Sequence, residues 1–304
     1  MALLKKSVQK LHFVWYYFDM PILNKVLSMH CISLLKGAVA SALLVLSLPA
    51  SAIFTNGGFE TGDFTGWTSG FGSNNGLQGS QPYSSASISY NPAAGSFRGA
   101  VVSAGPDLYG APIALPYAGT HTARVNNSAT GGYLNFISQT DTITVADLDP
   151  SDSQLHIRFN YAVVLDDPSH SASQQPFFFL RVRNVTKSTT LYEDFSFAGQ
   201  TGTQFVSVPS PTGGAQNPKF LDWKAADVIV PGADLGDTIE VYLMASDCSL
   251  SGHAGYAYLD GFGSRVVPPG ATAATPVPTL NETALMALGL LLAGVAATSL
   301  RRRS

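Results

Sequence analysis

Short segments in which apolar and polar residues alternate, with no helical repeat between them, most constrain the fold. In residues 155–161 the odd positions are apolar and the even ones polar, which is the pattern of a half-buried strand. Residues 141–145 alternate in the same way, and residues 238–244 and 256–262 are further strand candidates. Residues 177–183 begin apolar on both faces, as in a central strand, and then alternate. Strands without intervening helices predict an all-β, antiparallel β-sandwich of the jelly-roll type.

The N-terminal part carries a secretion signal. Residues 29–36 contain one firm positive charge, and residues 37–48 form an apolar segment that is too short to span a bilayer. Ala50 and Ala52 then match the A-x-A pattern of a signal peptidase site. We therefore expect a signal helix that signal peptidase removes by cleavage after Ala52.

Residues 1–28 fit poorly in front of this signal, because they contain the aromatic run of residues 15–18. We expect the true start to be Met29, or alternatively Met20. On this interpretation residues 1–52 comprise a spurious extension followed by the signal peptide.

The C-terminal part has the pattern of a membrane span. Residues 283–300 are apolar or small, and a helix of this length rises about 27 Å, enough to cross a bilayer core. The cluster Arg301, Arg302 and Arg303 follows. Positive residues after a span predict that this end stays in the cytoplasm, so the domain that precedes the span is expected outside.

The tetrapeptide Val277, Pro278, Thr279 and Leu280 lies just before this span. The order of tetrapeptide, transmembrane helix and terminal arginine cluster resembles the IPTL-CTERM sorting signals, which are relatives of PEP-CTERM. Val277 stands where that family usually has isoleucine. The resemblance implies processing by an exosortase-type membrane protease, an inner-membrane-anchored precursor, and a mature protein at the cell surface or outside the cell.

The segment between the two ends is one domain. Residues 268–276 form a linker rich in Pro, Ala and Thr that cannot pack a core, which leaves residues 53–267 as the β-sandwich domain and 277–304 as the sorting tail. Within 53–267 there are 18 acidic and 9 basic residues. Such an acidic domain should repel nucleic acid. It could suit Ca²⁺, although acidic surfaces also simply keep exported proteins soluble.

Two segments of the domain resemble a known fold family. Residues 56–67 begin Asn-Gly-Gly-Phe-Glu and end at Trp67, and residues 255–262 contain Asp260 between aromatic residues. They look like the first and last strands of galactose-binding-like jelly rolls, which include many carbohydrate-binding modules. The resemblance implies a sandwich of two antiparallel sheets in which the two ends of the domain meet.

In many of these folds a structural calcium ion lies where the two ends meet. The resemblance implies that its ligands would be Glu60, a main-chain carbonyl near Gly62 or Asp63, and Asp260. Such a ligand set suits Ca²⁺, which takes six to eight oxygen ligands. The alternative is that Glu60 and Asp260 are surface or turn residues without a metal.

Three aromatic residues are candidates for stacking on a sugar ring: Trp67, Tyr109 and Trp223. For Trp67 a place in the core is the stronger alternative, because large aromatic side chains are highly buried on average. Residues 69–119 are rich in Gly, Ser, Asn and Pro. We expect long loops there, with two or three short strands.

Two groups of residues could carry chemistry. Asp166, Asp167 and His170 could bind a metal, and Cys248 with His253 could form a nucleophile and base pair. Both are close neighbours in sequence, and such spacings arise readily by chance within a loop. No metalloprotease, serine hydrolase or P-loop motif accompanies them, so no catalytic residue is assigned.

Cys248 is expected to be the single cysteine of the mature protein. The only other cysteine, Cys31, lies in the signal, so the mature protein would hold one cysteine and no internal disulfide. We expect Cys248 to be a small buried residue.

The sequence thus predicts a non-enzymatic exported protein of the cell surface or extracellular matrix. Exosortase-type systems generally accompany exopolysaccharide production, so association with extracellular polysaccharide, for example in a biofilm, follows by association. The alternatives are a carbohydrate-binding module for a defined sugar, a secreted hydrolase on a β-sandwich scaffold, and a structural surface protein without a ligand.

Overall fold

The computed structural model describes residues 53–92, 95–149, 151–263 and 269–270. The predicted signal peptide and sorting tail, including the membrane-spanning helix and the arginine cluster, lie outside these ranges. Within them, no helix has the length and apolar character that crossing a membrane requires.

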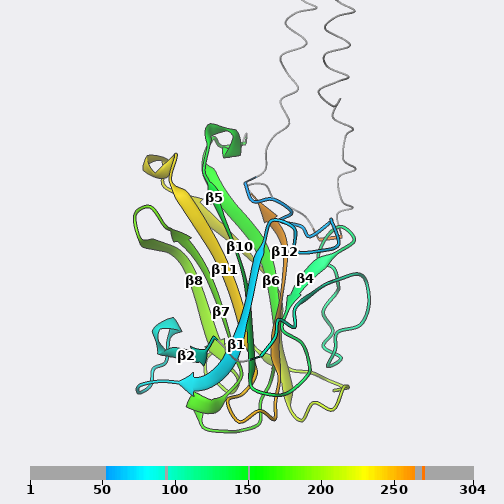
Figure 1. Cartoon of the computed structure of the whole chain (residues 1–304). Helices are drawn as coiled ribbons and strands as arrows, with labels where there is room; N and C mark the ends of the chain where they lie inside the picture. The colour runs from blue at the N-terminus through cyan, green and yellow to red at the C-terminus, as the bar shows by residue number, and fades with distance from the viewer. Residues whose placement is uncertain (1–52, 93–94, 150, 264–268, 271–304) are drawn as a thin grey trace, which may run out of the picture. The chain divides into compact units, whose positions relative to one another are not determined.

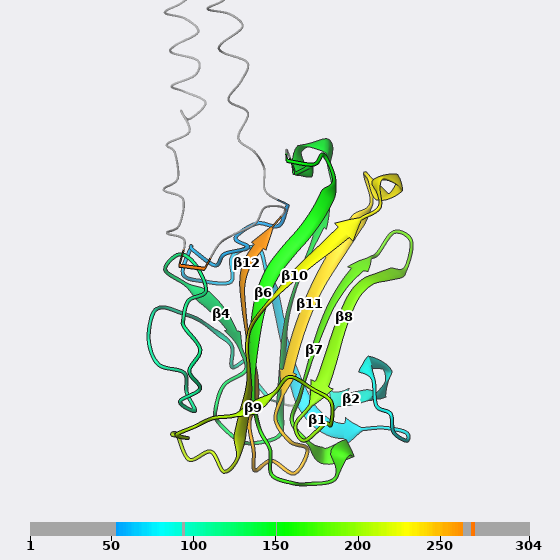
Figure 2. The ribbon, with the colours of Figure 1, turned by 180° about the vertical axis from the view of Figure 1, so that it is seen from behind.

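Two antiparallel six-stranded sheets form a sandwich (Figure 1 and, from behind, Figure 2). The first sheet has the strand order β2-β1-β5-β11-β7-β8, and the second has the order β3-β4-β12-β6-β10-β9. The prediction of an all-β antiparallel sandwich is therefore confirmed. The strands, in sequence order, are β1 (Thr68–Leu77), β2 (Ile88–Asn91), β3 (Ala100–Val102), β4 (Thr122–Val125), β5 (Tyr133–Thr142), β6 (Leu155–Asp166), β7 (Phe177–Asn184), β8 (Thr189–Phe197), β9 (Val206–Ser207), β10 (Pro218–Val230), β11 (Thr238–Ser246) and β12 (Gly255–Gly263).

Four of the five segments predicted as strands are strands: they lie in β6, β7, β11 and β12. The fifth, residues 141–145, is a strand only as far as Thr142. Beyond it, the N–H and the hydroxyl of Thr144 donate to the carboxylate of Asp147 at 2.8 and 2.7 Å. This local side-chain capping competes with the sheet and turns the chain into the 3₁₀ turn η2 (Val145–Asp147).

The main core lies between the two sheets. Alternate residues of β6, such as Ile157, Phe159 and Val163, face alternate residues of the first sheet, such as Leu180 and Val241, and all of them are fully buried. The period of two in the strands places these side chains on one face. The same period places the intervening side chains on the two outer faces, which must be covered by other means or stay exposed.

The outer face of the second sheet is covered by the loop of residues 103–119, part of the glycine- and serine-rich region. Side chains of this loop pack against outward-facing side chains of β6 and β12, and the resulting cluster includes Tyr109, Ala111, Ile113, Ala162, Val164, Tyr256 and Tyr258. The expectation of long loops in residues 69–119 is thus confirmed, although β1 is longer than the short strands expected there.

Asp107 holds this covering loop in place. Its side chain is only 4% exposed. The carboxylate accepts hydrogen bonds from the hydroxyls of Tyr256 (3.0 Å) and Tyr258 (2.8 Å) and from the backbone N–H groups of Tyr109 (2.9 Å) and Ala111 (3.0 Å). A buried carboxylate is tolerated only when donors satisfy it, and here two donors come from β12 and two from the loop.

A buried polar network joins the two sheets. The Asn126 side chain donates to the Asp247 carboxylate and to the Gly255 carbonyl, both at 2.9 Å. The N–H of Tyr133 also donates to Asp247 (2.9 Å), and the side chain of Asn135 donates to Asn126 (3.1 Å). Burial raises the pKa of Asp247 to about 7. Because β4 and β12 belong to one sheet and β5 and β11 to the other, the network fixes their mutual position.

The opening and closing segments of the domain meet, as the resemblance implied. The N–H of Phe262 donates to the carbonyl of Gly57 at 3.0 Å, and the Phe262 ring lies 4.7 Å from Phe54 and 5.9 Å from Trp67. The opening segment is not a strand, however: residues 53–66 form successive turns. The backbone approach is so close that a Cβ at Gly57 would lie 2.0 Å from the Phe262 carbonyl oxygen.

The substitution Gly57→Ala should therefore destabilise the domain. We expect the free energy of unfolding to fall by about 1–3 kcal/mol, as for overpacked sites, which corresponds to several degrees in Tm. Gly58→Ala is the matched control, because a Cβ at Gly58 would meet nothing closer than 3.7 Å. Thermal unfolding of both variants and the wild type measures the difference, and equal Tm values for the two variants would contradict this account.

Candidate functional site

The expected calcium ligands Glu60 and Asp260 both contact one loop, residues 117–121. The Glu60 carboxylate accepts the N–H of Thr120 (3.0 and 3.1 Å), the hydroxyl of Thr120 (2.7 Å) and the N–H of His121 (3.2 Å). Oδ2 of Asp260 accepts the N–H groups of Tyr117 (3.0 Å) and Ala118 (3.2 Å), and Oδ1 accepts that of Gly261 (2.6 Å). Each carboxylate oxygen of Glu60 therefore accepts two hydrogen bonds, and so does Oδ2 of Asp260.

Of the other two expected ligands, Asp63 is also engaged locally. The carbonyl of Asp63 accepts the Asn56 side chain at 2.9 Å, and the Asp63 carboxylate accepts the hydroxyl of Thr61 and the N–H of Thr65. Gly62 lies in the left-handed region, with φ of 78°, in the turn between them. In this arrangement the carboxylates of Glu60, Asp63 and Asp260 all accept hydrogen bonds from N–H or O–H donors.

Asp260 is the buried member of this set, with 1% of its surface exposed. Burial raises the pKa of Asp260 to about 7 against the opposing effect of its N–H donors, and the nearby Glu60 carboxylate raises it further. Asp260 and Glu60 thus hold the loop of residues 117–121 to the two ends of the domain by hydrogen bonds.

Calcium binding is testable at this place. Because hydrogen-bond donors already contact the carboxylates of Glu60 and Asp260, we expect the Tm of the dialysed full-length protein to be the same in equal millimolar concentrations of CaCl₂ and MgCl₂. An ion at a hundredfold excess over its Kd would add about 2.7 kcal/mol of stability. A rise in Tm specific to calcium and lost in Asp260→Asn would contradict this expectation and support the calcium site that the resemblance implied.

The three aromatic residues considered as candidates for stacking on sugars do not form a shared surface, and Trp67 lies in the core, as the stronger alternative held. Trp67 is 7% exposed, stacks on Phe59 and donates through Nε1 to the Asn56 carbonyl. Tyr109 is 2% exposed. Neither ring presents a face to solvent, because both belong to the packed clusters described above. Trp223 is half-buried, and its Nε1 donates to a carbonyl of the covering loop.

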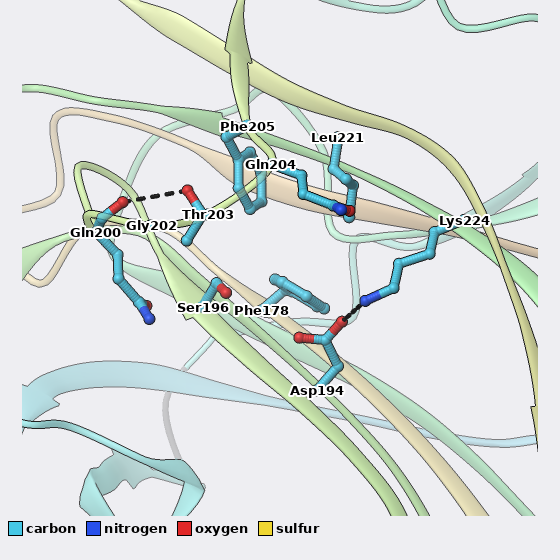
Figure 3. A pocket seen from close by; sticks show the side chains of 10 residues that line it. All are labelled: Phe178, Asp194, Ser196, Gln200, Gly202, Thr203, Gln204, Phe205, Leu221 and Lys224. Carbon is cyan, nitrogen blue, oxygen red and sulfur yellow. Dashed lines mark hydrogen bonds and ion pairs between the residues drawn. The ribbon is translucent and has the colours of Figure 1, made fainter.

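A polar cavity of about 320 Å³ opens at the edge of the sandwich between β8 and β10 (Figure 3). Side chains of Asp194, Lys224, Thr203 and Gln204 surround it. Lys224 donates to Asp194 at 2.8 Å, and the buried Tyr161 hydroxyl donates to the same oxygen. Asp194 is the one carboxylate in the lining, so this cavity lacks the pair of acids that glycoside hydrolysis requires.

Five aromatic side chains cross the outer face of the first sheet, and we name them the aromatic row: Tyr90 of β2, Phe136 of β5, Tyr242 of β11, Phe179 of β7 and Phe195 of β8. Ring centroids are 6.5 Å apart for Tyr90 and Phe136, 5.1 Å for the stacked pair Phe136 and Tyr242, and 5.9 Å for Tyr242 and Phe179. Phe195 pairs with Phe179 across the sheet. All except Phe179 are half-buried, so they present part of each ring to solvent.

Two glycines make the aromatic row continuous across β1. A Cβ at Gly70 would lie 2.1 Å from the Phe136 ring, and one at Gly72 would lie 2.5 Å from the Tyr90 ring. Glycine inside a strand usually weakens it and often marks a close approach. Here Gly70 and Gly72 leave room for the rings of Phe136 and Tyr90 to lie over β1.

Polar groups accompany the rings. The guanidinium of Arg181 lies 5.6 Å from the centroid of Phe179 and 5.9 Å from that of Tyr242, and it pairs with Glu240 at 3.0 Å. Burial raises the pKa of Tyr242, so its hydroxyl stays protonated. Within the described ranges, the hydroxyls of Tyr90 and Tyr242 have no hydrogen-bond partner.

Of the two groups considered for chemistry, the structure separates one and keeps the other together. Asp166 accepts backbone N–H groups of residues 216 and 217, and Asp167 pairs with Lys219 at 2.7 Å, so neither carboxylate is directed at His170. Cys248, fully buried as expected, and His253 are adjacent, with Sγ and Nδ1 3.6 Å apart. The ring of His170 lies 5.1 Å from that of His253.

The sequence alone did not predict the aromatic row. Tyr242 lies at an outward position of a predicted strand, so its orientation followed from the alternation. Phe136 lies in the part of β5 that precedes the predicted segment, and the positions of Tyr90 and β2 were not predicted. The ring positions also depend on pairing between strands far apart in sequence.

Comparisons with known proteins support the predicted sorting tail. Residues 275–303 match the IPTL-CTERM motif, which confirms the sorting signal predicted from Val277 to Leu280 and the arginine cluster. The motif indicates export, sorting to the cell surface and processing by an exosortase-type system. No curated protein matches the sequence.

Several solved β-sandwiches are similar to this chain at low identity. A Stig cyclase, Fisc, from Fischerella sp. TAU is 16% identical over 69% of this chain and 94% of its own, with a TM-score of 0.33. The carbohydrate-binding module CBM27-1 of Caldicellulosiruptor saccharolyticus, solved with mannohexaose, is 12% identical over 49% and 76%, with a TM-score of 0.27. A family 11 carbohydrate-binding module of Clostridium thermocellum is 7% identical over 65% and 85%, with a TM-score of 0.25. These similarities concern the fold alone.

Proposed function

We propose that this protein is a non-enzymatic component of the cell surface or extracellular matrix that binds polysaccharide along the aromatic row. The sorting motif places the domain in a pathway that leads out of the cell. Outside the cell, the ligand would be a polysaccharide and the binding surface would be the aromatic row. After processing by the exosortase-type system, the sandwich would be released or attached at the surface with this face available.

The observation that carries the proposal is the unequal covering of the two outer faces. The loop of residues 103–119 buries the tyrosines of the second sheet, whereas four of the five rings of the aromatic row keep part of their surface exposed. An apolar surface left open beside polar groups indicates an interaction site. Glycines 70 and 72 leave room for the rings of Phe136 and Tyr90, which supports an interaction role.

The chemistry of this face fits a neutral polysaccharide. Aromatic rings combine a large apolar surface with specific geometry, and they can cover the C–H face of a sugar. The unpartnered hydroxyls of Tyr90 and Tyr242 and the paired charges of Arg181 and Glu240 can exchange hydrogen bonds with sugar hydroxyls. Because Arg181 is neutralised by Glu240, the face offers little to a polyanion such as nucleic acid.

A binding role fits the cavities better than hydrolysis does. The cavity in Figure 3 contains one carboxylate, Asp194, already paired with Lys224. Cys248 and His253 lie together, with Sγ and Nδ1 3.6 Å apart, but both side chains are buried. The cavity lacks a second carboxylate and the Cys248–His253 pair is enclosed, so neither arrangement supports the hydrolase alternative as well as the aromatic row supports binding.

The variant Phe136→Ala/Tyr242→Ala removes the stacked pair at the centre of the row. We expect its affinity for polysaccharide to fall at least tenfold, because aromatic anchors at the centre of a site carry 1.4 kcal/mol or more, about tenfold in Kd. Affinity electrophoresis of the full-length protein through gels containing xylan, mannan, mixed-linkage glucan or anionic alginate measures the effect. The neutral polymers should retard the wild type, and alginate should not.

Trp223→Ala is the control, because Trp223 contacts the covering loop of the other sheet and should leave retardation unchanged. Thermal unfolding establishes that both variants are folded. Equal retardation of wild type and the double variant would reject the aromatic row as the site. Loss of retardation in Trp223→Ala alone would move the site to the second sheet and support a defined-sugar module there.

A further inference from the structure

Two loops at one end of the sandwich bring three metal-ligand side chains together. His170 lies in the β6–β7 connection, and Cys248 and His253 lie in the β11–β12 connection. One nitrogen of each imidazole and the Cys248 sulfur all lie within 4.8 Å of one another. His253 is 8% exposed and Cys248 is fully buried. No pattern in the sequence joins the three, because His170 is 78 residues from Cys248.

The polar atoms of this cluster are incompletely satisfied. Nε2 of His253 and Nδ1 of His170 are buried and have no hydrogen-bond partner, and the same is true of Oε1 of Gln175, whose amide nitrogen donates to the His170 carbonyl. Three of the five unpartnered buried side-chain atoms found in the described ranges belong to these residues. Burying a polar atom without a partner is unfavourable, and a metal bound through Nδ1 of His170 would give one of these atoms a partner.

We propose that His170, Cys248 and His253 bind a transition-metal ion of the Zn²⁺ class. Three atoms no more than 4.8 Å apart share a point within about 2.8 Å of each, so shifts of less than about 1 Å reach the Zn–N and Zn–S bond lengths of about 2.0–2.3 Å. The 3.6 Å between Cys248 Sγ and His253 Nδ1 matches the edge of about 3.6 Å that those bond lengths give in a tetrahedral site, so Nδ1, and not the unpartnered Nε2, would be the ligand atom of His253.

The ligand set selects the metal. Thiolate and imidazole prefer zinc and copper to calcium or magnesium. The nearby carboxylates that would favour a hard ion are engaged elsewhere, Asp166 by backbone N–H groups and Asp167 by Lys219. The N–H of Gly252 donates to Cys248 Sγ at 3.3 Å, and such bonds to a ligand sulfur stabilise the thiolate in metal sites.

The metal would join the two sheets. The β6–β7 connection runs from the second sheet to the first, and the β11–β12 connection runs from the first to the second. A metal held by one side chain of the former and two of the latter links both crossovers. Three protein ligands leave a fourth position, which water can fill.

Titration with Co²⁺, followed by displacement with Zn²⁺, tests the proposal. The full-length protein carries Cys31→Ser, so that Cys248 is the only thiol, and is kept reduced. We expect one equivalent of Co²⁺ to give a thiolate-to-metal absorption band, Zn²⁺ to abolish the band and raise Tm, and Ca²⁺ to do neither. Copper added in place of zinc should bind more tightly.

Variants distinguish this site from adventitious binding. Cys248→Ser should abolish the band, and His170→Ala, at a half-buried loop position, should weaken Co²⁺ binding at least tenfold. His121→Ala, outside the cluster, should change neither. Absence of the band in folded wild-type protein, or a band unaffected by Cys248→Ser or by His170→Ala, would overturn the proposal. Circular dichroism confirms that each variant is folded.

Discussion

The buried carboxylate of Asp107 determines which face of this sandwich stays open. Its hydrogen bonds to Tyr256 and Tyr258 hold the loop of residues 103–119 against the second sheet. Packing two sheets together buries only their inner faces. The aromatic side chains on each outer face are therefore either covered by another segment or exposed to solvent. One is covered by this loop, and the other carries the aromatic row.

Other long-range contacts hold the two sheets in their relative position. Asn126 and Asp247 tie the sheets together near one end. At the other end Gly57 lies directly against Phe262, and Glu60 and Asp260 hold the loop of residues 117–121. At the domain ends, the carboxylates of Glu60 and Asp260 accept hydrogen bonds from the loop of residues 117–121 and so connect that loop to both ends of the domain.

The strand-forming part of the fold was predictable because it is local. Alternation in residues 155–161 or 238–244 follows from the period of the strand itself, and the sorting tail is a linear motif. The partners of Asp260, the burial of Trp67 and the alignment of Phe136 with Tyr242 depend on residues that are distant in sequence. For the same reason Cys248 and His253 were recognised as a pair, whereas His170 was grouped with two aspartates that turn out to bind elsewhere.

The central claim is that the aromatic row is the polysaccharide-binding surface. Hydrogen–deuterium exchange of the full-length protein, with and without a retarding neutral polysaccharide, tests it most directly because it reports on every strand at once. The account predicts added protection in β5, β7, β8 and β11 and none in the loop of residues 103–119. Protection confined to that loop, or to residues 200–205 beside the cavity in Figure 3, would contradict it.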